Sequence, residues 1–394
     1  MYSVEKAAAE IQYEVWITDN ASSDGSVEYL GQRFPYVHFI RNTENAGFAK
    51  ANNQAMEKCK GEYILCLNPD TLIPEDCLTG CLAFIRLDPG AGALGVRMID
   101  GSGTFLPESK RSFPHPFGSL FKLVGLSRMY PTSKIFSTYS LGYLDEFTNH
   151  KVDVLAGAFM LLKRSLLLQL KGFDESFFMY GEDIDLSYRI RKAGYENYYF
   201  AGSTIIHFKG ESTSKGSLNY VDMFYRAMNT FVRKHYAGRK ASVFRFFLQT
   251  AISLRAIASI FSRLMLNTWK GRLNAAKQRN DAKDGKQTIV IATKAEYMEV
   301  VELLEKSGAA KGIMGRVAVN EEVEDALTNL DGFYTLVKSQ QIKKVVFCNG
   351  VLSYSRIIDM VQRVPKNVSL RFHAIGSGSI VGSDSRETSG EYIA

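Results

Sequence analysis

The ten residues Glu62–Thr71, EYILCLNPDT, form an apolar run that ends in Asn, Pro and Asp. This pattern is typical of a buried β-strand that opens into a polar loop. Two similar runs, Tyr13–Thr18 and His38–Arg41, precede it, and helical segments separate the three. Strands that alternate with helices predict an α/β layer with a mostly parallel sheet. Ligands of such sheets gather at the carboxyl ends of the strands, where Asp19 and Asp70 both fall.

The alternation of strands and helices continues further along the chain. Val152–Leu162 and Ser203–Phe208 are predicted strands, and Asp185–Ala193 is a predicted helix. Before them, Ser102–Asn149 is irregular, with several prolines and many aromatic residues. This segment is expected to be a long loop, a lid or a small subdomain.

A second, smaller α/β unit is predicted near the C-terminus. Gln287–Ala292 and Lys343–Cys348 are expected strands, and Ala295–Ser307 is an expected helix between them. The polar stretch Asn280–Lys286 is the predicted boundary, since domain linkers are rich in such residues. A chain of 394 residues is long enough for two or three domains. We expect domains at residues 1–240 and 286–394, joined by a helix and linker at residues 241–285.

The composition is that of a folded protein, because 46% of the residues are hydrophobic and 23% are charged. This balance excludes a largely disordered chain. The five cysteines form no CxxC pair, and no secretory signal opens the chain. We therefore expect a cytosolic protein with free thiols.

The net charge of +7 is concentrated in one band of the sequence. Arg233–Lys283 holds twelve lysines and arginines and one acidic residue, whereas a general nucleic-acid binder spreads its positive charge more widely. Within this band, Val243–Lys270 predicts an amphipathic helix with Arg245, Arg263 and Lys270 on one side. The helix is too charged to span a bilayer. It either lies on an anionic membrane surface or packs its apolar half on the protein and leaves its basic residues solvated.

Three polar clusters follow the predicted strands of the first half. Asp19–Ser26 (DNASSDGS) is rich in good helix caps, so it either starts a helix or forms a site. Asn45–Asn53 (NAGFAKANN) has too many Asn for an ordinary helix and offers donors and acceptors for a sugar or a base. In Asn68–Thr71 (NPDT), Asp70 can hold a divalent cation that holds a diphosphate, or it can form an Asx turn.

Two further candidates lie between the irregular segment and the basic band. Glu182–Asp185 (EDID) follows the aromatic run Phe177–Gly181 (FFMYG). Its carboxylates either cap the next helix, where the helix dipole favours them, or supply a general base with a pKa raised by burial and crowding. His207 ends a predicted strand and is either a structural residue or a ligand.

Taken together and in this order, the clusters resemble the family 2 glycosyltransferases of GT-A fold, and in particular their bacterial rhamnosyltransferase-like branch. The resemblance covers roughly residues 10–215. Six ordered motifs carry it: DNASSDGS, NAGFAKANNQA, LNPDT, LAGAFMLLKR, GFDESFFMYGEDIDLSYRIRKAGY and IIHFKGEST.

The resemblance implies a role for each matching residue. Asp183 matches the catalytic base, and Asp70 and His207 match the contacts to a divalent cation, Mg²⁺ or Mn²⁺, that holds the diphosphate. A single base without a covalent partner implies inversion at the anomeric carbon. The donor side is implied to include Asp19, Asp24, Asn45, Gly47, Asn53 and Asp70. The acceptor side is implied to include Gly157, Ala158 and Glu182.

Both ends of the chain depart from this pattern. Members of the family begin with an apolar strand and most of a helix before the DN motif, whereas about eighteen residues precede Asp19 here. Met1–Glu10 is expected to be the end of that helix, the first strand is expected to be missing, and the exposed sheet would be a liability. The C-terminal part faintly resembles the Rossmann-like region of bacterial polyprenyl glycosylphosphotransferases. Its turn at Ala292–Ala295 lacks the glycines of a phosphate site, which favours a structural or partner-docking domain.

The sequence therefore predicts a GT-A-type catalytic domain without its first strand, a basic amphipathic helix and a small Rossmann-like domain. The implied function is transfer of a sugar such as rhamnose from a nucleotide-diphosphate donor to a glycan or lipid-linked acceptor in cell-surface polysaccharide synthesis. We expect a cytoplasmic protein, peripheral at the inner face of the cell membrane, with no nucleic-acid partner. The alternative is a degenerate, non-catalytic relative that binds a partner enzyme through its C-terminal part.

Overall fold

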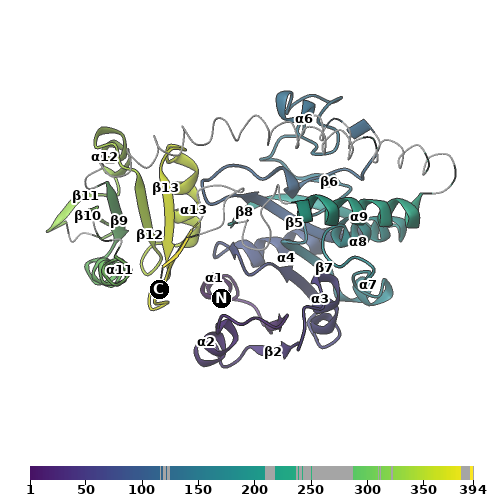
Figure 1. Cartoon of the computed structure of the whole chain (residues 1–394), viewed down its shortest axis with the longest axis horizontal. Coiled ribbons are helices and arrows are strands. Elements are labelled where there is room, and N and C mark those ends of the chain that lie inside the picture. The colour runs from purple at the N-terminus through teal and green to yellow at the C-terminus, as the bar shows by residue number, and fades with distance from the viewer. Residues whose placement is uncertain are drawn as a thin grey trace.

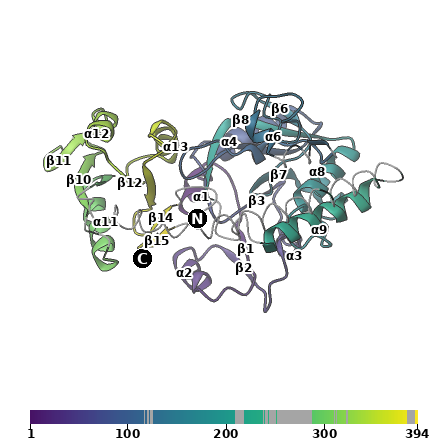
Figure 2. The same cartoon turned by 45° about the horizontal axis from the view of Figure 1, so that its top comes forward.

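The computed structural model describes residues 1–115, 117, 118, 121, 125–208, 218–236, 238, 242, 250, 287–308, 310, 312–320, 323–382 and 391–393. The helix predicted at Val243–Lys270, apart from residue 250, and the linker predicted at Asn280–Lys286 lie outside these residues. Figures 1 and 2 show an N-terminal region, residues 1–236, beside a C-terminal region, residues 287–393, and each region has a sheet of its own.

A six-stranded mixed sheet forms the centre of the N-terminal region. Only β5 and β8 pair in parallel, and the other pairings are antiparallel, so the prediction of a mostly parallel sheet is wrong here. Paired strands such as β3 and β7 are far apart in the sequence, so their direction depends on which strands become neighbours. The order is β3 (Tyr63–Leu67), β7 (Phe159–Lys163), β5 (Ala91–Ile99), β8 (Glu196–His207) and β4 (Thr71–Leu72), with β6 (His150–Val152) also on β8.

Two strands differ from the sequence-based expectation. Val152–Leu162 is not one strand, because a turn separates β6 from β7. The central strand β5 was not predicted at all, although all nine of its residues are buried. Its sequence, AGALGVRMI, is rich in small residues that propensity does not assign to strands. A Cβ atom at Gly92 would lie 2.7 Å from the side chain of Ile190 and 2.9 Å from that of Leu166, so close packing against helices requires glycine there.

Helices cover both faces of this sheet. The helices α1 (Tyr2–Ala7) and α4 (Cys77–Leu87) share one apolar cluster with β5 and β7. On the other face, α3 (Phe48–Met56), α7 (Arg164–Gln169) and α8 (Glu182–Lys192) pack into a second cluster. The helix α9 (Leu218–His235) lies beside α8 in Figure 1. The irregular segment carries only short helical turns among its described residues, the longest being α6 (Leu126–Met129).

The beginning of the chain forms a separate small layer. The strands β1 (Trp16–Asp19) and β2 (His38–Arg41) pair in parallel around α2 (Ser26–Arg33). Within the described part of the chain, these two strands have no hydrogen-bonded partner in the six-stranded sheet. The helix expected within Met1–Glu10 is present as α1.

The C-terminal region has a seven-stranded sheet, which confirms the predicted βαβ-type unit. Its first five strands are parallel, and the chain moves outward from β9 first on one side and then on the other. The order is β11 (Ala326–Asn329), β10 (Ile313–Ala318), β9 (Thr288–Ala292), β12 (Lys344–Cys348), β13 (Ser369–His373), β14 (Ile380–Gly382) and β15 (Glu391–Ile393). Its helices are α11 (Lys294–Lys306), α12 (Phe333–Ser339) and α13 (Tyr354–Arg363).

The two regions share one apolar cluster. Leu72, Ile99 and Ile206 from the six-stranded sheet are buried with Ile357 and Val361 of α13. Figures 1 and 2 show α13 on the side of the C-terminal region that faces the N-terminal region. Among the helices the structure describes, none has the length and apolar character needed to cross a bilayer.

Candidate active site

The backbone before α8 sets the position of Asp183. Tyr180 and Gly181 both have left-handed conformations, with φ of 68° and 87°, immediately before the first turn of the helix. Glycine adopts this conformation freely, but for Tyr180 it is costly unless the surrounding structure holds it. A Cβ atom at Gly181 would lie 3.1 Å from the Cβ atom of Ala227 on α9, so the loop passes close to that helix. The turn thus fixes the direction in which Glu182 and Asp183 enter the site.

The carboxylate of Asp183 is paired with an arginine from the irregular segment. Arg111 Nη2 donates to Asp183 Oδ2 at 2.5 Å and to the carbonyl oxygen of Leu155 at 2.7 Å. Both side chains are largely buried, with 12% and 15% exposure for Arg111 and Asp183. Burial disfavours the charged form of Arg111, but the nearby carboxylate outweighs this effect, and the pKa of Arg111 lies above its ordinary value. Arg111 therefore holds the carboxylate of Asp183 in one orientation.

Glu182 lies next to this pair but in a different environment. It is 6% exposed, and its Oε2 atom has no hydrogen-bond partner among the described residues. Burial, and then the negative charge of Asp183, raise the pKa of Glu182 to about 8. At neutral pH Glu182 is therefore mostly protonated.

A second pair lies at the edge of the six-stranded sheet. Asp70 directly precedes β4, His207 ends β8, and Asp70 Oδ1 lies 3.2 Å from His207 Nε2. The register sets this contact, because Thr71 pairs with His207 and the Phe208 amide donates to the Asp70 carbonyl at 2.9 Å. Asn68 Nδ2 is 3.5 Å from the same nitrogen of His207.

These two side chains fit one end of a divalent cation site. A carboxylate oxygen and an imidazole nitrogen are suitable ligands for Mn²⁺, and a carboxylate alone suits Mg²⁺. His207 Nδ1 is buried and has no hydrogen-bond partner within the part of the chain that the structure describes. No group of three or more His, Cys, Asp or Glu side chains suited to a metal occurs among those residues. The remaining ligands would therefore have to come from a substrate or from water.

A short stretch between β6 and β7 joins the two pairs. The Asn68 amide donates to the carbonyl oxygen of Ala158 at 3.0 Å. A Cβ atom at Gly157 would lie 3.7 Å from the Cβ atom of Asp183 and 3.6 Å from the ring of Phe48. Gly157 and Ala158 thus bring Asp183 and the Asp70–His207 pair to the same end of the sheet.

Two of the predicted donor loops contact each other at Gly47. Asn20 Nδ2 donates to the Gly47 carbonyl at 3.3 Å, and Asn45 Oδ1 accepts from the Gly47 amide at 3.0 Å. Gly47 has φ of 83°, and a Cβ atom there would lie 2.7 Å from the Phe178 carbonyl oxygen, so the loop is fixed close to the segment before α8. These contacts place Asn45 and Gly47 beside the loop that carries Asp183.

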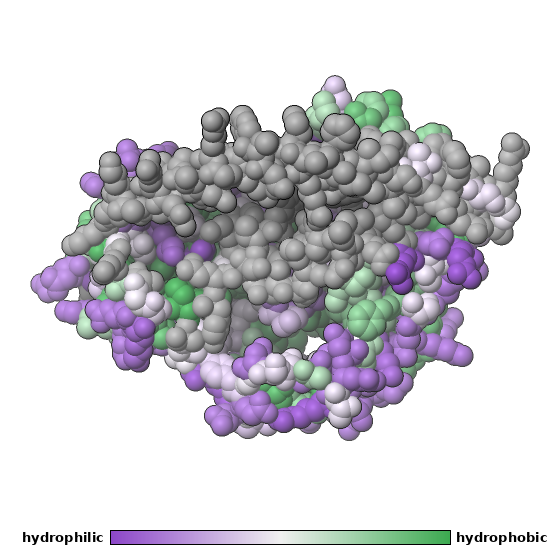
Figure 3. Space-filling view, in the orientation of Figure 1, coloured by the Kyte–Doolittle hydropathy of each residue, from purple (hydrophilic) through white to green (hydrophobic). Residues whose placement is uncertain are grey.

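The acidic residues of the first loop mainly organise their own backbone. Asp19 accepts weakly from the Ser22 amide, at 3.2 and 3.3 Å, and Asp24 accepts from the Ser26 amide at 3.0 Å. Asp24 is exposed, and Figure 3 shows hydrophilic side chains along the lower rim, where α2 and β2 lie. No direct contact joins Asp24 to the other predicted site residues in the described structure. Its role in donor binding stays a prediction.

Asn53 has a clear structural contact. Its Oδ1 accepts from the Phe173 amide at 2.8 Å, and its Nδ2 donates to the Phe173 carbonyl at 2.9 Å and to Glu175 at 3.0 Å. The side chain thus holds the loop that leads to α8. Its predicted contact with a donor remains a prediction.

A buried cluster attaches α9 to α8. Asp185 is fully buried and accepts from Arg189 Nε at 2.6 Å, Lys234 Nζ at 2.8 Å and His235 Nε2 at 2.6 Å. Burial alone would raise the pKa of Asp185, but the hydrogen bond from His235 and the charge of Arg189 lower it to about 2. This cluster keeps the first turn of α8 in place.

Arg111 is a site residue that was not predicted from the sequence. It lies in the segment that was expected to be irregular, and only its position beside Lys110 before a proline-rich stretch marks it. Nothing local reveals that this guanidinium contacts a carboxylate 72 residues away.

Comparisons with known proteins place the chain in one family. The model of the family "Glycosyl transferase family 2" matches residues 3–170. The rhamnosyltransferase WbbL of Escherichia coli is 30% identical over 210 residues, which are 51% of this chain and 75% of that protein. The N-acetylglucosaminyl-diphospho-decaprenol L-rhamnosyltransferase of Mycobacterium tuberculosis is 26% identical over 268 residues, 65% of this chain and 86% of that protein.

Solved structures give a weaker likeness. A mannosyltransferase of Pyrobaculum calidifontis, in complex with GDP-Man and Mn²⁺, is 18% identical with a TM-score of 0.38, covering 69% of this chain and 79% of that one. Residues 1–349 of TarS from S. aureus are 15% identical with a TM-score of 0.39, covering 63% of this chain and 65% of that one.

The matches to the family model and to WbbL define the class, and the chain belongs to glycosyl transferase family 2. It is an α/β glycosyltransferase that uses a nucleotide sugar. The family and the class of enzyme expected from the six motifs are thereby confirmed.

Proposed function

We propose that this chain is an inverting glycosyltransferase that moves a rhamnosyl-type sugar from a nucleotide diphosphate to a lipid-linked glycan in cell-surface polysaccharide synthesis. One observation carries the proposal. The carboxylate of Asp183, held by Arg111, lies beside Gly157, and the next residue, Ala158, is hydrogen-bonded to Asn68, two residues before Asp70 of the Asp70–His207 pair. Direct displacement at an anomeric carbon needs these two features, a base for the acceptor and positive charge near the leaving group.

Asp183 is the proposed general base. It takes the proton of the acceptor hydroxyl as that oxygen attacks the anomeric carbon from the face opposite the leaving diphosphate. Arg111 keeps the carboxylate aimed at the acceptor, and the absence of a Cβ atom at Gly157 leaves room beside it. This orientation is needed because proton transfer requires hydrogen-bond distance between the base and the hydroxyl.

Asp70 and His207 are the proposed holders of the donor diphosphate. A divalent cation bound there would neutralise the charge that develops on the departing diphosphate. The described residues supply only two ligands, so the diphosphate oxygens would complete the site. Asn68 Nδ2 lies 3.5 Å from the same Nε2 atom of His207 and helps to position the ring.

The state of Glu182 supports inversion. A retaining displacement needs a second carboxylate as nucleophile. The carboxyl group nearest to the base is Glu182, and it is buried with a pKa of about 8, so it is mostly neutral at pH 7. A neutral, buried carboxyl group is a poor nucleophile.

The sugar and acceptor of the proposal come from the relatives. The name of the M. tuberculosis relative states that it transfers L-rhamnose to N-acetylglucosaminyl-diphospho-decaprenol, and its alignment covers 86% of that protein. A lipid-linked acceptor agrees with the basic band at Arg233–Lys283 and with a cytoplasmic enzyme peripheral to the inner face of the membrane.

A nucleotide-release assay tests the proposal. The full chain is incubated with dTDP-rhamnose, UDP-sugars or GDP-sugars, with Mn²⁺ or Mg²⁺, and with a synthetic N-acetylglucosaminyl diphosphate lipid. We expect acceptor-dependent release that falls by roughly 100-fold to 10,000-fold in Asp183→Asn. Asp331→Asn, an exposed residue of the C-terminal region, is the matched control and should keep wild-type turnover. Full turnover by Asp183→Asn would refute the base, and no turnover with any donor would favour the non-catalytic alternative.

A further inference from the structure

The C-terminal sheet has the crevice at which parallel α/β folds usually bind ligands. The winding direction reverses between β9 and β12, and the turns beyond these two strands lead toward α11 and α13. In such a crevice the amides at a helix N-terminus commonly bind a phosphate.

Here carboxylates of the protein itself accept the hydrogen bonds of those amides. Glu296 is 1% exposed and accepts from the Thr293 amide at 2.8 Å, the Thr293 hydroxyl at 2.9 Å and the Gly350 amide at 2.7 Å. It therefore fills the place of an anion between α11 and the end of β12. An anionic ligand would have to displace this buried side chain.

At the N-terminus of α13, the backbone amides donate to a side chain of the N-terminal region. Glu75 Oε1 accepts from the Tyr354 amide at 2.7 Å, and Glu75 Oε2 accepts from the Ser355 amide at 3.0 Å. Lys6 Nζ donates to the Asn349 carbonyl at 2.8 Å and lies 5.1 Å from the centre of the Tyr354 ring. The crevice thus binds the neighbouring region of the same chain.

Glu75 is linked to the Asp70–His207 pair by a short piece of backbone. Residues 70–75 contain Asp70, the two-residue edge strand β4 and Glu75. Leu72, within β4, is buried with Ile206 and with side chains of α13. The segment that positions Asp70 is therefore held at its far end by the C-terminal region.

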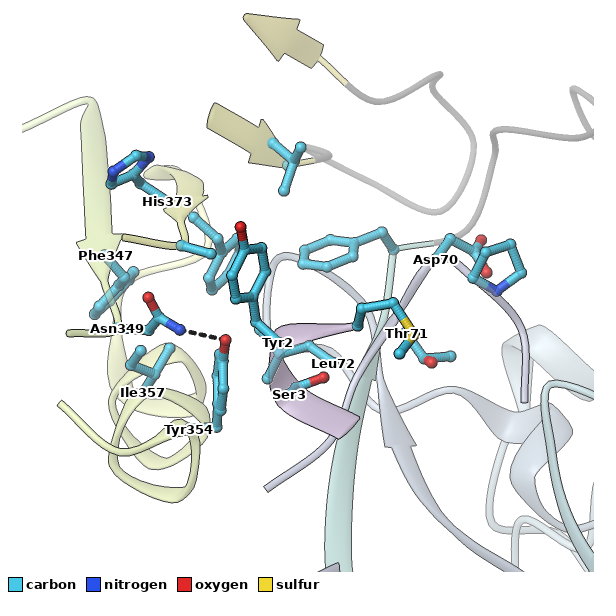
Figure 4. A pocket seen from close by; sticks show the side chains of 17 residues that line it. Tyr2, Ser3, Asp70, Thr71, Leu72, Phe347, Asn349, Tyr354, Ile357 and His373 are labelled. Carbon is cyan, nitrogen blue, oxygen red and sulfur yellow. Dashed lines mark hydrogen bonds between the residues drawn. The ribbon is translucent and has the colours of Figure 1, made fainter. Parts of the chain in front are cut away.

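The His207 side of the pair is held in the same way. Phe208 follows His207, and its ring packs against Phe372 of β13 with the ring centres 5.1 Å apart. Figure 4 shows Asp70 and Thr71 facing Asn349, Tyr354 and Ile357 across the boundary, with Tyr2 and Ser3 between them. A cavity of about 300 Å³ remains at this boundary.

We propose that the C-terminal region acts as a brace for the Asp70–His207 pair and that Glu75 is the positioning residue through which it acts. This inference rests on the proposed function, in which Asp70 and His207 hold a cation and the donor diphosphate. A two-residue strand at the edge of a sheet has few hydrogen bonds of its own, so its position depends on what holds its ends.

Substitution of Glu75 tests the brace. Glu75→Gln keeps the size of the side chain but removes the charge at the N-terminus of α13. We expect the dissociation constant of Mn²⁺, measured from free Mn²⁺ by EPR in the presence of dTDP or UDP, to rise at least about fivefold. The donor KM should rise by a similar factor, while kcat changes less than about twofold. Glu62→Gln, an exposed carboxylate in a surface pair with Arg86, should leave all three constants unchanged.

Two further measurements make the outcome decisive. If Glu75→Gln lowers the unfolding temperature but leaves Mn²⁺ affinity at 25 °C unchanged, Glu75 is merely structural and the brace is refuted. Asp70→Asn separates the two proposals. If Asp70→Asn binds Mn²⁺ as tightly as the wild type, the cation site itself is overturned. If Asp70→Asn loses Mn²⁺ binding but Glu75→Gln binds Mn²⁺ as the wild type does, only the brace is overturned.

Discussion

The buried carboxyl group of Glu182 makes a quantitative prediction about stability. In the unfolded chain a Glu side chain has a pKa near 4.5, whereas burial and the charge of Asp183 raise the pKa of Glu182 to about 8 in the folded protein. Between these two values the folded state retains a proton that the unfolded state has lost. The contribution of Glu182 to stability is therefore complete below pH 4.5 and is lost as the pH rises towards 8, at about 1.4 kcal/mol per pH unit.

Glu182→Gln removes this titration while keeping the shape of the side chain. We expect the variant to gain about 3 kcal/mol in unfolding free energy relative to the wild type between pH 5 and pH 7. Urea unfolding of both proteins at pH 5, 6 and 7 measures the difference, in which titrations shared by the two proteins cancel. The exposed Glu302→Gln on α11 is the control, since its carboxylate lies on the surface.

Parallel stability curves for the wild type and Glu182→Gln would refute this reasoning. Such a result would mean that Glu182 is solvated or paired in solution. The same comparison bears on mechanism, because a Glu182 that is charged at pH 7 would remove the argument against a second carboxylate nucleophile.

Two other predictions follow from the contacts of the site, and a third follows from the basic band of the sequence. Arg111→Met should lower kcat about 10-fold to 100-fold with little change in donor KM, because Asp183 loses its orientation, and Arg111→Lys should restore part of the rate. Asp185→Asn should cost about 3 kcal/mol at pH 7 in urea unfolding, because it leaves buried cations unpaired, and the cost should shrink as the pH falls from about 4 towards 2. Wild-type protein should float with anionic liposomes, and equal flotation of a variant with three charge reversals would contradict the electrostatic attraction. The reversals are Arg245→Glu, Arg255→Glu and Arg263→Glu.

The sequence was most informative where local chemistry decides the structure. The apolar run before Asn68 became β3, and the carboxylates of Glu182–Asp185 became the first turn of α8. These features depend on short-range rules for strand ends and helix starts. His207 and Asp70 were both selected as candidates, and the register of β4 and β8 brings them to 3.2 Å.

The sequence was least informative where distant contacts decide the structure. Strand β5 carries Gly92 because helices pack closely on it and Gly95 because Leu155 approaches it closely, and a propensity scale counts both glycines against a strand. The direction of strands also escaped prediction, because pairing depends on which strands become neighbours and not on their own residues.

The same distinction explains how the two halves of the site are held. The motifs provide the reacting groups, Asp183 at one end and Asp70 with His207 at the other. The groups that hold them come from elsewhere in the sequence. Arg111 is 72 residues from Asp183, and the amides that bind Glu75 are about 280 residues away from it. If these contacts position the reacting groups as proposed, substitutions at Arg111 and Glu75 should affect different constants, kcat in the first case and donor KM in the second. A double variant should then combine both losses nearly additively, because the two contacts share no partner and act on opposite sides of the reaction.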